Sequence, residues 1–535
     1  MFKLTSDHLE YIIVAIFCLL FLDYGLGSVM DHKITHPAPK GGLAQDYYYH
    51  LIHTDFVLSQ GHYKYMPAFF TFGVDNALGQ QPAGQYYLSA LFTKVSNLTT
   101  WDATNVLLFS LLLLYILLFY VFIRRYNKKI ALLSLPFSFL LLKFPFISIF
   151  SWGFHLFLVG ALSFFTLLFL MPMLDSKYTA VLAGIVAAAG IVSHIPPFAF
   201  AAFVSFFLLL YKLWRKTLSK SYLIGLVVTG VITLVLGLQH LSIFLGIWFN
   251  LSAFQGHHLY AATVYFKSLG VYGWISLLGV LASFYLLIID KKFGELVAMN
   301  LGILLILISP VFGNSRAYQL RFFWFLFAGF FIAVLIYFII QMFKSHLPGI
   351  IYQYSTLGIT VILLITFVFQ AEPANGDALI SDNYWNSMVQ AEQIIEPGKS
   401  VLFIDPSASQ VNHMWEVQRT VFIVHPNRII EKLQSGSLDS FFYVDYNGDH
   451  PPQKRVSLFK FEEMPYDKEY YSGRSRSLCE FEYIFLNFER TTPEYRQYMA
   501  QLFAANNITE RFALHNIGTD IALLRNLGEL APCRN

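Results

Sequence analysis

Titratable side chains gather in residues 41–56, GGLAQDYYYHLIHTDF, of a chain that is otherwise strongly apolar. Asp46, His50 and His53 are spaced i, i+4 and i+7, so a helix would carry all three on one face. A carboxylate placed there can take a proton from a hydroxyl group, or can hold a divalent metal that activates the hydroxyl. Neighbouring histidines can orient the carboxylate or bind an anion.

A purely structural interpretation of this stretch stays open. The pattern predicts an amphipathic helix over 44–61 and a second one over 81–95, and tyrosine-rich helices of this kind favour the membrane interface. The solvated face of such a helix needs polar residues, and His53 and Asp55 would serve there without any chemistry. An Asp-x3-His-x2-His spacing is also compatible with a metal site, but it is a short pattern.

Long apolar helices must position these residues. The chain has 535 residues, of which 56% are hydrophobic and 13% are charged, whereas soluble proteins carry about 25% charged residues. This composition predicts a polytopic α-helical membrane protein, and the net charge of +3 does not suggest a nucleic-acid partner. Hydropathy predicts about eleven spans, at 9–27, 103–123, 130–149, 154–174, 178–193, 196–214, 222–240, 273–290, 295–312, 319–343 and 349–370.

Basic residues give the orientation of these spans. They cluster at 124–129, 212–220 and 291–292, and eleven spans place all three clusters on the same side of the membrane. The positive-inside rule makes that side cytoplasmic. The N-terminus is then cytoplasmic in a plasma or inner membrane, and the long loop 28–102 and the chain from residue 371 onward are extracytoplasmic.

The composition changes at about residue 371, which divides a membrane domain, 1–370, from an extracytoplasmic domain, 371–535. Short apolar runs alternate there with helical patterns, as in a soluble α/β domain with a largely parallel sheet. Cys479 and Cys533 can pair in an oxidising compartment or remain free thiols. The predicted strands lie at 400–405, 420–424, 481–488 and 520–526, and the helical patterns at 384–395 and 492–506.

The order of these features resembles the GT-C superfamily of membrane glycosyltransferases, which use polyprenyl-phosphate-linked sugars. One helix precedes a long outer loop with an acid in a D-Y-x-x-H-like setting, and two interfacial helices and about ten more spans follow. The segments GHYKYMP, 61–67, and QQPAGQYYLSAL, 80–91, are similar to the first-loop pattern of bacterial and archaeal members. The resemblance implies that Asp46 is the general base for the acceptor hydroxyl in an inverting transfer on the extracytoplasmic side.

One feature departs from that family. Several relatives carry paired acids in a D-x-D or E-x-D motif, whereas Tyr48 occupies the second position here. Asp75, later in the same loop, can supply the second acid. The metal site that the resemblance would then imply is formed by Asp46 and Asp75 and binds Mg²⁺ or Mn²⁺, but the missing pair leaves metal dependence open.

A polyprenyl phosphate is an anion, so its site needs cations near the outer interface. Arg316 and Arg321 flank the loop 313–318, and arginine can grip a phosphate with two hydrogen bonds. Interfacial snorkelling of both arginines is the alternative. Further candidates for the substrate site, each with an ordinary structural role as its alternative, are Lys64, His194, His257 and His258.

Two other classes of function remain open. A polysaccharide polymerase or O-antigen-ligase-like enzyme would share the donor, but such proteins usually have their large outer loop late in the chain. A transporter or flippase for lipid-linked sugars would show repeated halves and broken helices near the bilayer midplane. The acceptor, whether protein, lipid or glycan, and the sugar are not readable from the sequence.

Overall fold

The computed structural model describes residues 6–533 in two compact units. The first unit comprises Met1–Thr35, Pro82–Leu88 and Asp102–Gly376, and the second comprises His36–Gln81, Ser89–Trp101 and Asp377–Asn535. The residues outside the description are 1–5, 31–37, 44, 64–82, 145, 152, 250–266, 290, 309–315, 347, 375, 378–379, 397–398, 406–419, 440, 442–443, 446–452, 458–459, 465–475 and 534–535.

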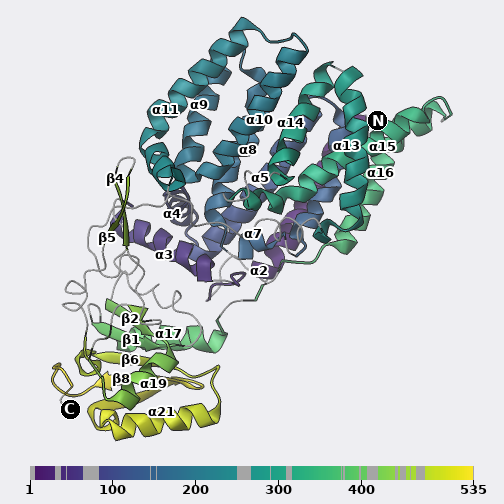
Figure 1. Cartoon of the computed structure of the whole chain (residues 1–535). Coiled ribbons are helices and arrows are strands. Elements are labelled where there is room, and N and C mark those ends of the chain that lie inside the picture. The colour runs from purple at the N-terminus through teal and green to yellow at the C-terminus, as the bar shows by residue number, and fades with distance from the viewer. Residues whose placement is uncertain are drawn as a thin grey trace. The chain divides into compact units, whose positions relative to one another are not determined.

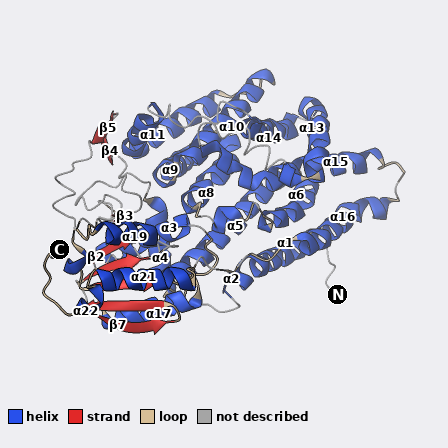
Figure 2. Ribbon diagram, turned by 60° about the horizontal axis from the view of Figure 1, so that its bottom comes forward, coloured by secondary structure: helices blue, strands red, loops and turns tan. Residues whose placement is uncertain are grey.

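The described residues of the first unit and of the first long loop, 28–102, are mainly helical (Figures 1 and 2). The helices from the N-terminus through the first long loop are α1 (Ser6–Leu22), the π-helical turn η1 (Asp23–Gly27), α2 (Ser28–Met30), α3 (Gln45–Gln60) and α4 (Gly84–Ser96). Then follow α5 (Thr100–Arg124), α6 (Lys128–Ser134), η3 (Leu135–Leu142), α7 (Ser148–Ser151), α8 (His155–Leu170), η4 (Met171–Met173), α9 (Lys177–Ser193), α10 (Ile195–Trp214), α11 (Lys220–Phe249), α13 (Val271–Ile289), α14 (Lys291–Ile308), η7 (Arg316–Phe323), α15 (Trp324–Met342) and α16 (Gly349–Gln370).

Eight helices in the described ranges are long and apolar enough to cross a bilayer. Two shorter apolar helices, Lys177–Ser193 and Phe293–Ile306, coincide with two more predicted spans. The two predicted helices of the first long loop are also confirmed, as α3 and α4. The membrane-protein class is therefore confirmed, whereas the total of eleven spans stays a prediction.

The predicted span 130–149 takes a different form. Its α-helix, α6, ends at Ser134, and the chain continues as the buried 3-10 helix η3. Pro136 lies in the first turn of η3, where its ring and missing N–H oppose continuation of an α-helix. With rises of 1.5 and 2.0 Å per residue, α6 and η3 together cover roughly 26 Å, close to the roughly 30 Å of a hydrocarbon core.

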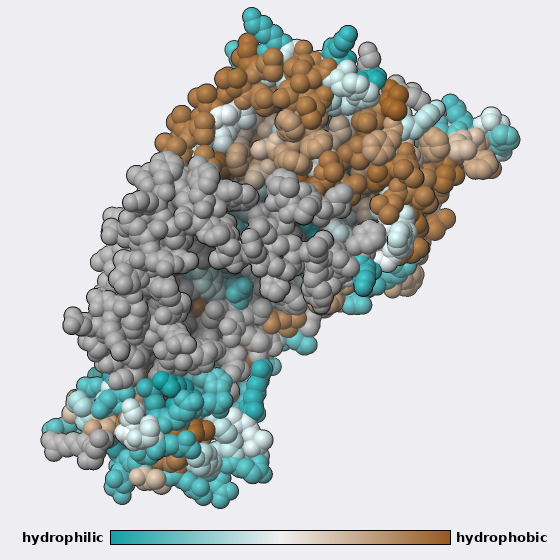
Figure 3. Space-filling model, in the orientation of Figure 1, coloured by the Kyte–Doolittle hydropathy of each residue, from teal (hydrophilic) through white to brown (hydrophobic). Residues whose placement is uncertain are grey.

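The face of the membrane unit that is coloured in Figure 3 is largely apolar, as its brown colour shows. Large hydrophobic side chains such as Val235, Leu281 and Phe369 are exposed there. A soluble protein rarely exposes a contiguous apolar surface of this extent. The chain is an integral membrane protein whose exposed helix faces contact lipid.

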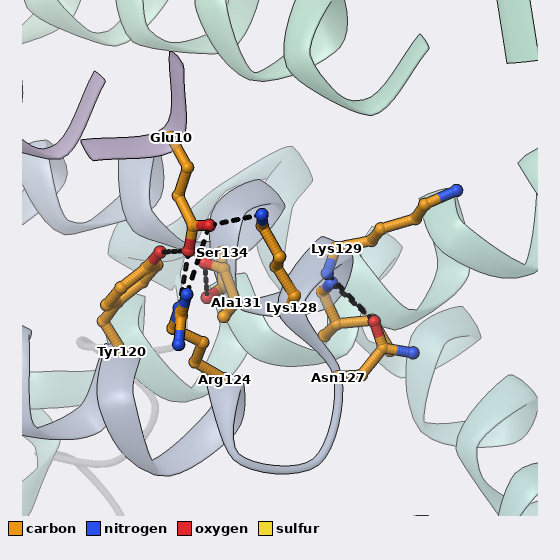
Figure 4. Close-up of polar contacts among 9 residues, drawn as sticks. Glu10, Tyr120, Arg124, Asn127, Lys128, Lys129, Ala131 and Ser134 are labelled. Carbon is orange, nitrogen blue, oxygen red and sulfur yellow. Dashed lines mark hydrogen bonds and ion pairs between the residues drawn. The ribbon is translucent and has the colours of Figure 1, made fainter. Parts of the chain in front are cut away.

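A buried acid anchors the first helix to its neighbours (Figure 4). The Glu10 side chain is fully buried in α1, and its Oε1 accepts hydrogen bonds from Tyr120 and from Arg124 Nε, the latter at 2.7 Å. Lys128 Nζ lies 2.7 Å from Glu10 Oε2. A buried carboxylate is tolerated because opposite charges and hydrogen bonds surround it.

Replacing this acid should therefore destabilise the membrane unit. In Glu10→Ala, the Tyr120 hydroxyl and two cations lose their shared partner, and we expect a loss of about 2 kcal/mol in the free energy of unfolding. Thermal unfolding in detergent would measure the loss. Glu372→Ala removes an exposed acid and serves as the control. Equal unfolding temperatures for the two variants would contradict a structural role for Glu10.

The second unit contains a six-stranded sheet with the order β3-β2-β1-β6-β8-β7. Strands β3, β2, β1 and β6 run parallel to one another, and β8 runs antiparallel to both of its neighbours, β6 and β7. The predicted, largely parallel α/β sheet is thus confirmed. The bounds are β1 (Ser400–Ile404), β2 (Thr420–Val424), β3 (Val444–Asp445), β6 (Tyr483–Asn487), β7 (Phe512–Gly518) and β8 (Ile521–Asn526), with a separate hairpin of β4 (Gln453–Ser457) and β5 (Lys460–Met464).

Helices cover both faces of this sheet. Alternate residues of a strand point to opposite faces, so each strand packs against helices on both sides. Leu402 and Ile484 pack with residues of α19 (Pro426–Ser435) and α21 (Pro493–Ala505) in one apolar core. On the other face, the Phe485 ring lies 5.8 Å from the Tyr384 ring of α17 (Asp382–Ile394). Figure 2 shows these helices beside the strands. The predicted helical patterns correspond to α17 and α21.

A disulfide fastens the C-terminal end to this unit. Cys479 and Cys533 form the bond, with their Cα atoms 5.2 Å apart. The bond closes a sequence separation of 54 residues, and a loop of this length gives a disulfide a stabilisation of about 4 kcal/mol in a chain-entropy model. The pairing that the sequence left open is therefore present.

Candidate active site

The approach to α3 is fixed by close backbone packing. Gly41 adopts a φ of 80° and donates its N–H to the Asp377 carbonyl at 3.0 Å. A Cβ on Gly42 would lie 2.3 Å from the Tyr47 ring, so only glycine allows the chain to pass there. The Tyr47 hydroxyl donates to the Lys40 carbonyl at 3.3 Å. These contacts hold the beginning of α3 in place.

The candidate base lies in the first turn of α3. Asp46 is exposed, and the positive end of the helix dipole favours a negative charge at this position. His50 and His53 follow on the same helical face but are both buried. The predicted helix therefore carries all three residues, with the acid accessible and the two histidines packed inside.

His53 is held by aromatic side chains. Its Nδ1 lies 2.7 Å from the Tyr63 hydroxyl, and its ring centroid lies 4.5 Å from that of Tyr49. Burial, together with nearby His50, holds the pKa of His53 well below its ordinary value. His53 is therefore neutral at physiological pH, which suits a residue that fixes α3 better than one that binds an anion.

Asp55 is half-buried toward the far end of α3. The Thr100 hydroxyl, at the beginning of α5, donates a hydrogen bond to Asp55 Oδ1. Burial raises the pKa of Asp55 to about 6 from its ordinary value of 3.8. The carboxyl group thus titrates close to neutral pH, where groups at functional sites often titrate.

This shift predicts a pH dependence of stability. The folded state binds the Asp55 proton more tightly, so its contribution to stability is full below about pH 4 and is lost as the pH rises through about 6. The loss is up to about 3 kcal/mol. Asp55→Asn, whose amide oxygen can still accept from Thr100, should remove this component. Unfolding temperatures from pH 4 to 7 would test it, and parallel curves for the two proteins would contradict the shift.

The candidate cation Arg321 lies in the membrane unit. It is half-buried in η7, and its guanidinium carbon lies 5.7 Å from the centre of the Phe322 ring. Aromatic contacts fix η7, because the ring of Phe322 lies 5.0 Å from that of Phe154 and the ring of Phe323 lies 5.9 Å from that of Phe157. A charged residue at the beginning of a membrane helix is costly, which favours a function for it.

His194 joins the same aromatic cluster. It connects α9 to α10, donating its backbone N–H to the Gly190 carbonyl at 2.7 Å, and its buried ring lies 6.0 Å from Phe157. The two spans that nearly touch in the sequence are thus separate helices joined at this residue. The structure brings His194 and η7 together around Phe157.

The other candidates are described in part or not at all. Arg316 begins η7, and only its backbone is described. Four candidates lie outside the described residues: Lys64, Asp75, His257 and His258.

Similar structures were found among known proteins, although no family model and no curated protein matches the sequence. ArnT from Cupriavidus metallidurans, bound to undecaprenyl phosphate, has a TM-score of 0.56 and 12% identity over 99% of this chain and 100% of its own. The archaeal oligosaccharyltransferase AglB from Archaeoglobus fulgidus, in complex with an inhibitory peptide and a dolichol-phosphate, has a TM-score of 0.53 and 11% identity over 97% and 74%. The chain has the GT-C fold. The mycobacterial arabinofuranosyltransferase AftD matches with a TM-score of 0.55 and 10% identity, over 99% of this chain and 40% of AftD.

The metal site predicted for this chain consists of Asp46 and Asp75. Within the described ranges, no three His, Cys, Asp or Glu side chains lie close enough to hold a metal ion. One A. fulgidus oligosaccharyltransferase structure of the same fold is a complex with zinc and sulfate. A metal bound by Asp46 and Asp75 stays a prediction, since Asp75 lies outside the described residues.

The sequence did not reveal the residues that contact α3 within the first long loop. Tyr63 and Thr100 contact His53 and Asp55 from 10 and 45 residues away. No spacing rule links such pairs. The one available signal was that Tyr63 lies in the GHYKYMP segment, 61–67, which is similar to the first-loop pattern of the GT-C superfamily.

Proposed function

We propose that this protein is a membrane glycosyltransferase that transfers a sugar from a polyprenyl-phosphate-linked donor to an acceptor hydroxyl. The observation that supports it best is the shared GT-C fold, which extends over 97% of this chain for AglB and 99% for ArnT. Both neighbours hold a polyprenyl phosphate, dolichol-phosphate in one and undecaprenyl phosphate in the other. The likeness therefore favours a lipid phosphate as the donor's leaving group.

The reaction is a single displacement with inversion at the anomeric carbon. The acceptor oxygen attacks that carbon, and Asp46 takes the hydroxyl proton. The bond from the carbon to the lipid phosphate oxygen breaks, and its electron pair leaves with the phosphate. Arg321, together with Arg316, stabilises the charge that grows on this oxygen. The products are the glycosylated acceptor and a polyprenyl phosphate.

The proposed orientation places this chemistry outside the cytoplasm. The basic clusters near Arg124, Lys212 and Lys291 mark the cytoplasmic ends of the spans. The Cys479–Cys533 disulfide supports an oxidising compartment for the domain 371–535. That domain has a binding or stabilising role, and the membrane domain 1–370 holds the donor. The acceptor is a protein, a lipid or a glycan.

Binding of the product lipid tests the proposal without knowledge of the sugar. Native mass spectrometry of the purified protein would compare undecaprenyl and dolichyl phosphate with the corresponding alcohols. The phosphates should bind at least about tenfold more tightly, because a charge-assisted hydrogen bond contributes about 1.5–3 kcal/mol. Equal retention of phosphates and alcohols would contradict a phosphate site.

A further inference from the structure

An apolar groove opens on the membrane unit between α10, α13 and α14. It has a volume of about 460 Å³, within the roughly 300–1,000 Å³ of small-molecule sites. Helix α14 packs against both α10 and α13, and side chains of all three helices form the lining. The residues used below are Leu210 and Trp214 of α10, Phe284 and Leu287 of α13, and Ala298 and Leu301 of α14.

The position of the groove along the helices is set by its lining residues. Trp214 is the last residue of α10, and Leu287 lies two residues before the end of α13. Lys291 begins α14. The groove therefore reaches the basic ends of α10 and α13, which the proposed orientation places in the cytoplasmic leaflet, and its lining on α14 begins about two turns after Lys291. Trp214 and Phe284 are exposed, so the groove is open to lipid.

A cation lies across this end of the groove. Arg215 directly follows Trp214, and its Nη1 donates a hydrogen bond to the Ile288 carbonyl of α13 at 3.0 Å. The guanidinium carbon lies 5.3 Å from the centre of the Trp214 ring. Among the described residues, Arg215 Nε is buried without a hydrogen-bond partner. The guanidinium thus links the C-terminal ends of α10 and α13 beside the groove, and it has N–H groups that can donate further hydrogen bonds.

Among the described residues of α10, α13 and α14, the one acid is Glu295, and it is already paired. Glu295 Oε1 lies 2.6 Å from Lys212 Nζ, and the Tyr126 hydroxyl donates to Glu295 Oε2 at 3.4 Å. Arg215 and the exposed Lys216 are left to face the headgroup region. Basic residues at the end of an apolar groove between membrane helices suit an anionic lipid headgroup.

We propose that this groove binds an anionic glycerophospholipid of the leaflet at the basic ends of the helices. An acyl chain lies over Ala298 and Leu301 between α10 and α13, and the phosphate group accepts hydrogen bonds from Arg215. The small side chain of Ala298 leaves room for the chain on the floor of the groove. The site is independent of the proposed glycosyl transfer, and its lipid is neither donor nor acceptor.

Native mass spectrometry of the intact protein would test the site with phosphatidylglycerol and phosphatidylcholine of identical acyl chains. Wild type should retain phosphatidylglycerol preferentially, and Arg215→Gln should reduce that preference about fivefold. Lys216→Gln should reduce it too, and it keeps the test valid if Arg215→Gln fails to fold. Ala298→Leu should weaken binding of both lipids alike, because it fills the floor of the groove.

The control is Lys177→Gln, which removes an exposed cation at the beginning of α9 and should leave the preference unchanged. An unchanged preference in both Arg215→Gln and Lys216→Gln would overturn the headgroup assignment. Undecaprenyl phosphate that displaces phosphatidylglycerol from wild type, but not from Ala298→Leu, would also overturn the proposal. It would assign the groove to the tail of a polyprenyl lipid.

Discussion

Asp46→Asn should reduce the turnover of sugar transfer at least about 100-fold, because a general base contributes roughly 10²–10⁴-fold. The amide has the shape of the carboxylate but cannot take the proton of the acceptor hydroxyl. Donor binding should change little, since the proton moves only in the transition state. Turnover and donor KM, measured with membranes or proteoliposomes, would separate the two effects.

Loss of folding would not explain this result. Asp46 is exposed, and exposed substitutions usually change stability by less than about 0.5 kcal/mol. The matched control is Asp382→Asn, which makes the same change at an exposed acid in the first turn of α17. It should retain full activity. Turnover of Asp46→Asn within a few-fold of wild type would remove this residue from the mechanism.

Arg321→Gln should also reduce turnover about 100-fold. The loss of one preorganised donor to a developing anion typically costs about 10²–10³-fold. Arg321→Lys keeps the charge but loses the planar pair of donors, so its turnover should lie between those of wild type and Arg321→Gln. Binding of undecaprenyl phosphate should weaken in the same order.

An arginine elsewhere in the chain provides the control for this series. Arg525 is exposed on β8 of the sheet, and Arg525→Gln should leave both turnover and lipid binding unchanged. If Arg321→Gln lost stability but retained wild-type turnover and lipid affinity, Arg321 would not stabilise the leaving phosphate. That outcome would assign Arg321 to packing around Phe322.

Periodicity in the sequence was sufficient for α3, α4 and the long helices, but not for η7, the 3-10 helix of Arg316 and Arg321, where the sequence predicted a loop, 313–318, followed by the span 319–343. The apolar runs predicted the long helices, the amphipathic pattern over 44–61 predicted α3, and the alternation of short runs predicted the sheet. These signals are local, because the period of a helix or a strand is visible within one segment. The expected likeness to GT-C enzymes used the order of the same segments.

Contacts over long sequence separations were not predictable in this way. Glu10 lies at the beginning of a predicted span, and its partners Tyr120 and Arg124 are more than 100 residues away. The disulfide closes a separation of 54 residues, and no local pattern distinguishes paired from free thiols. The 3-10 continuation after Ser134 depends on one proline in a run that otherwise reads as helix.

The most direct test of the central claim follows the fate of the lipid carrier. The purified protein would be reconstituted with polyprenyl-phosphate sugars extracted from cells of its own source, together with a crude extract of acceptors, and the lipids would be analysed by mass spectrometry. The account predicts loss of one lipid-linked sugar and an equimolar gain of polyprenyl phosphate, both absent with Asp46→Asn. Lipid-linked sugars of unchanged mass and amount, as a transporter would leave them, would contradict it.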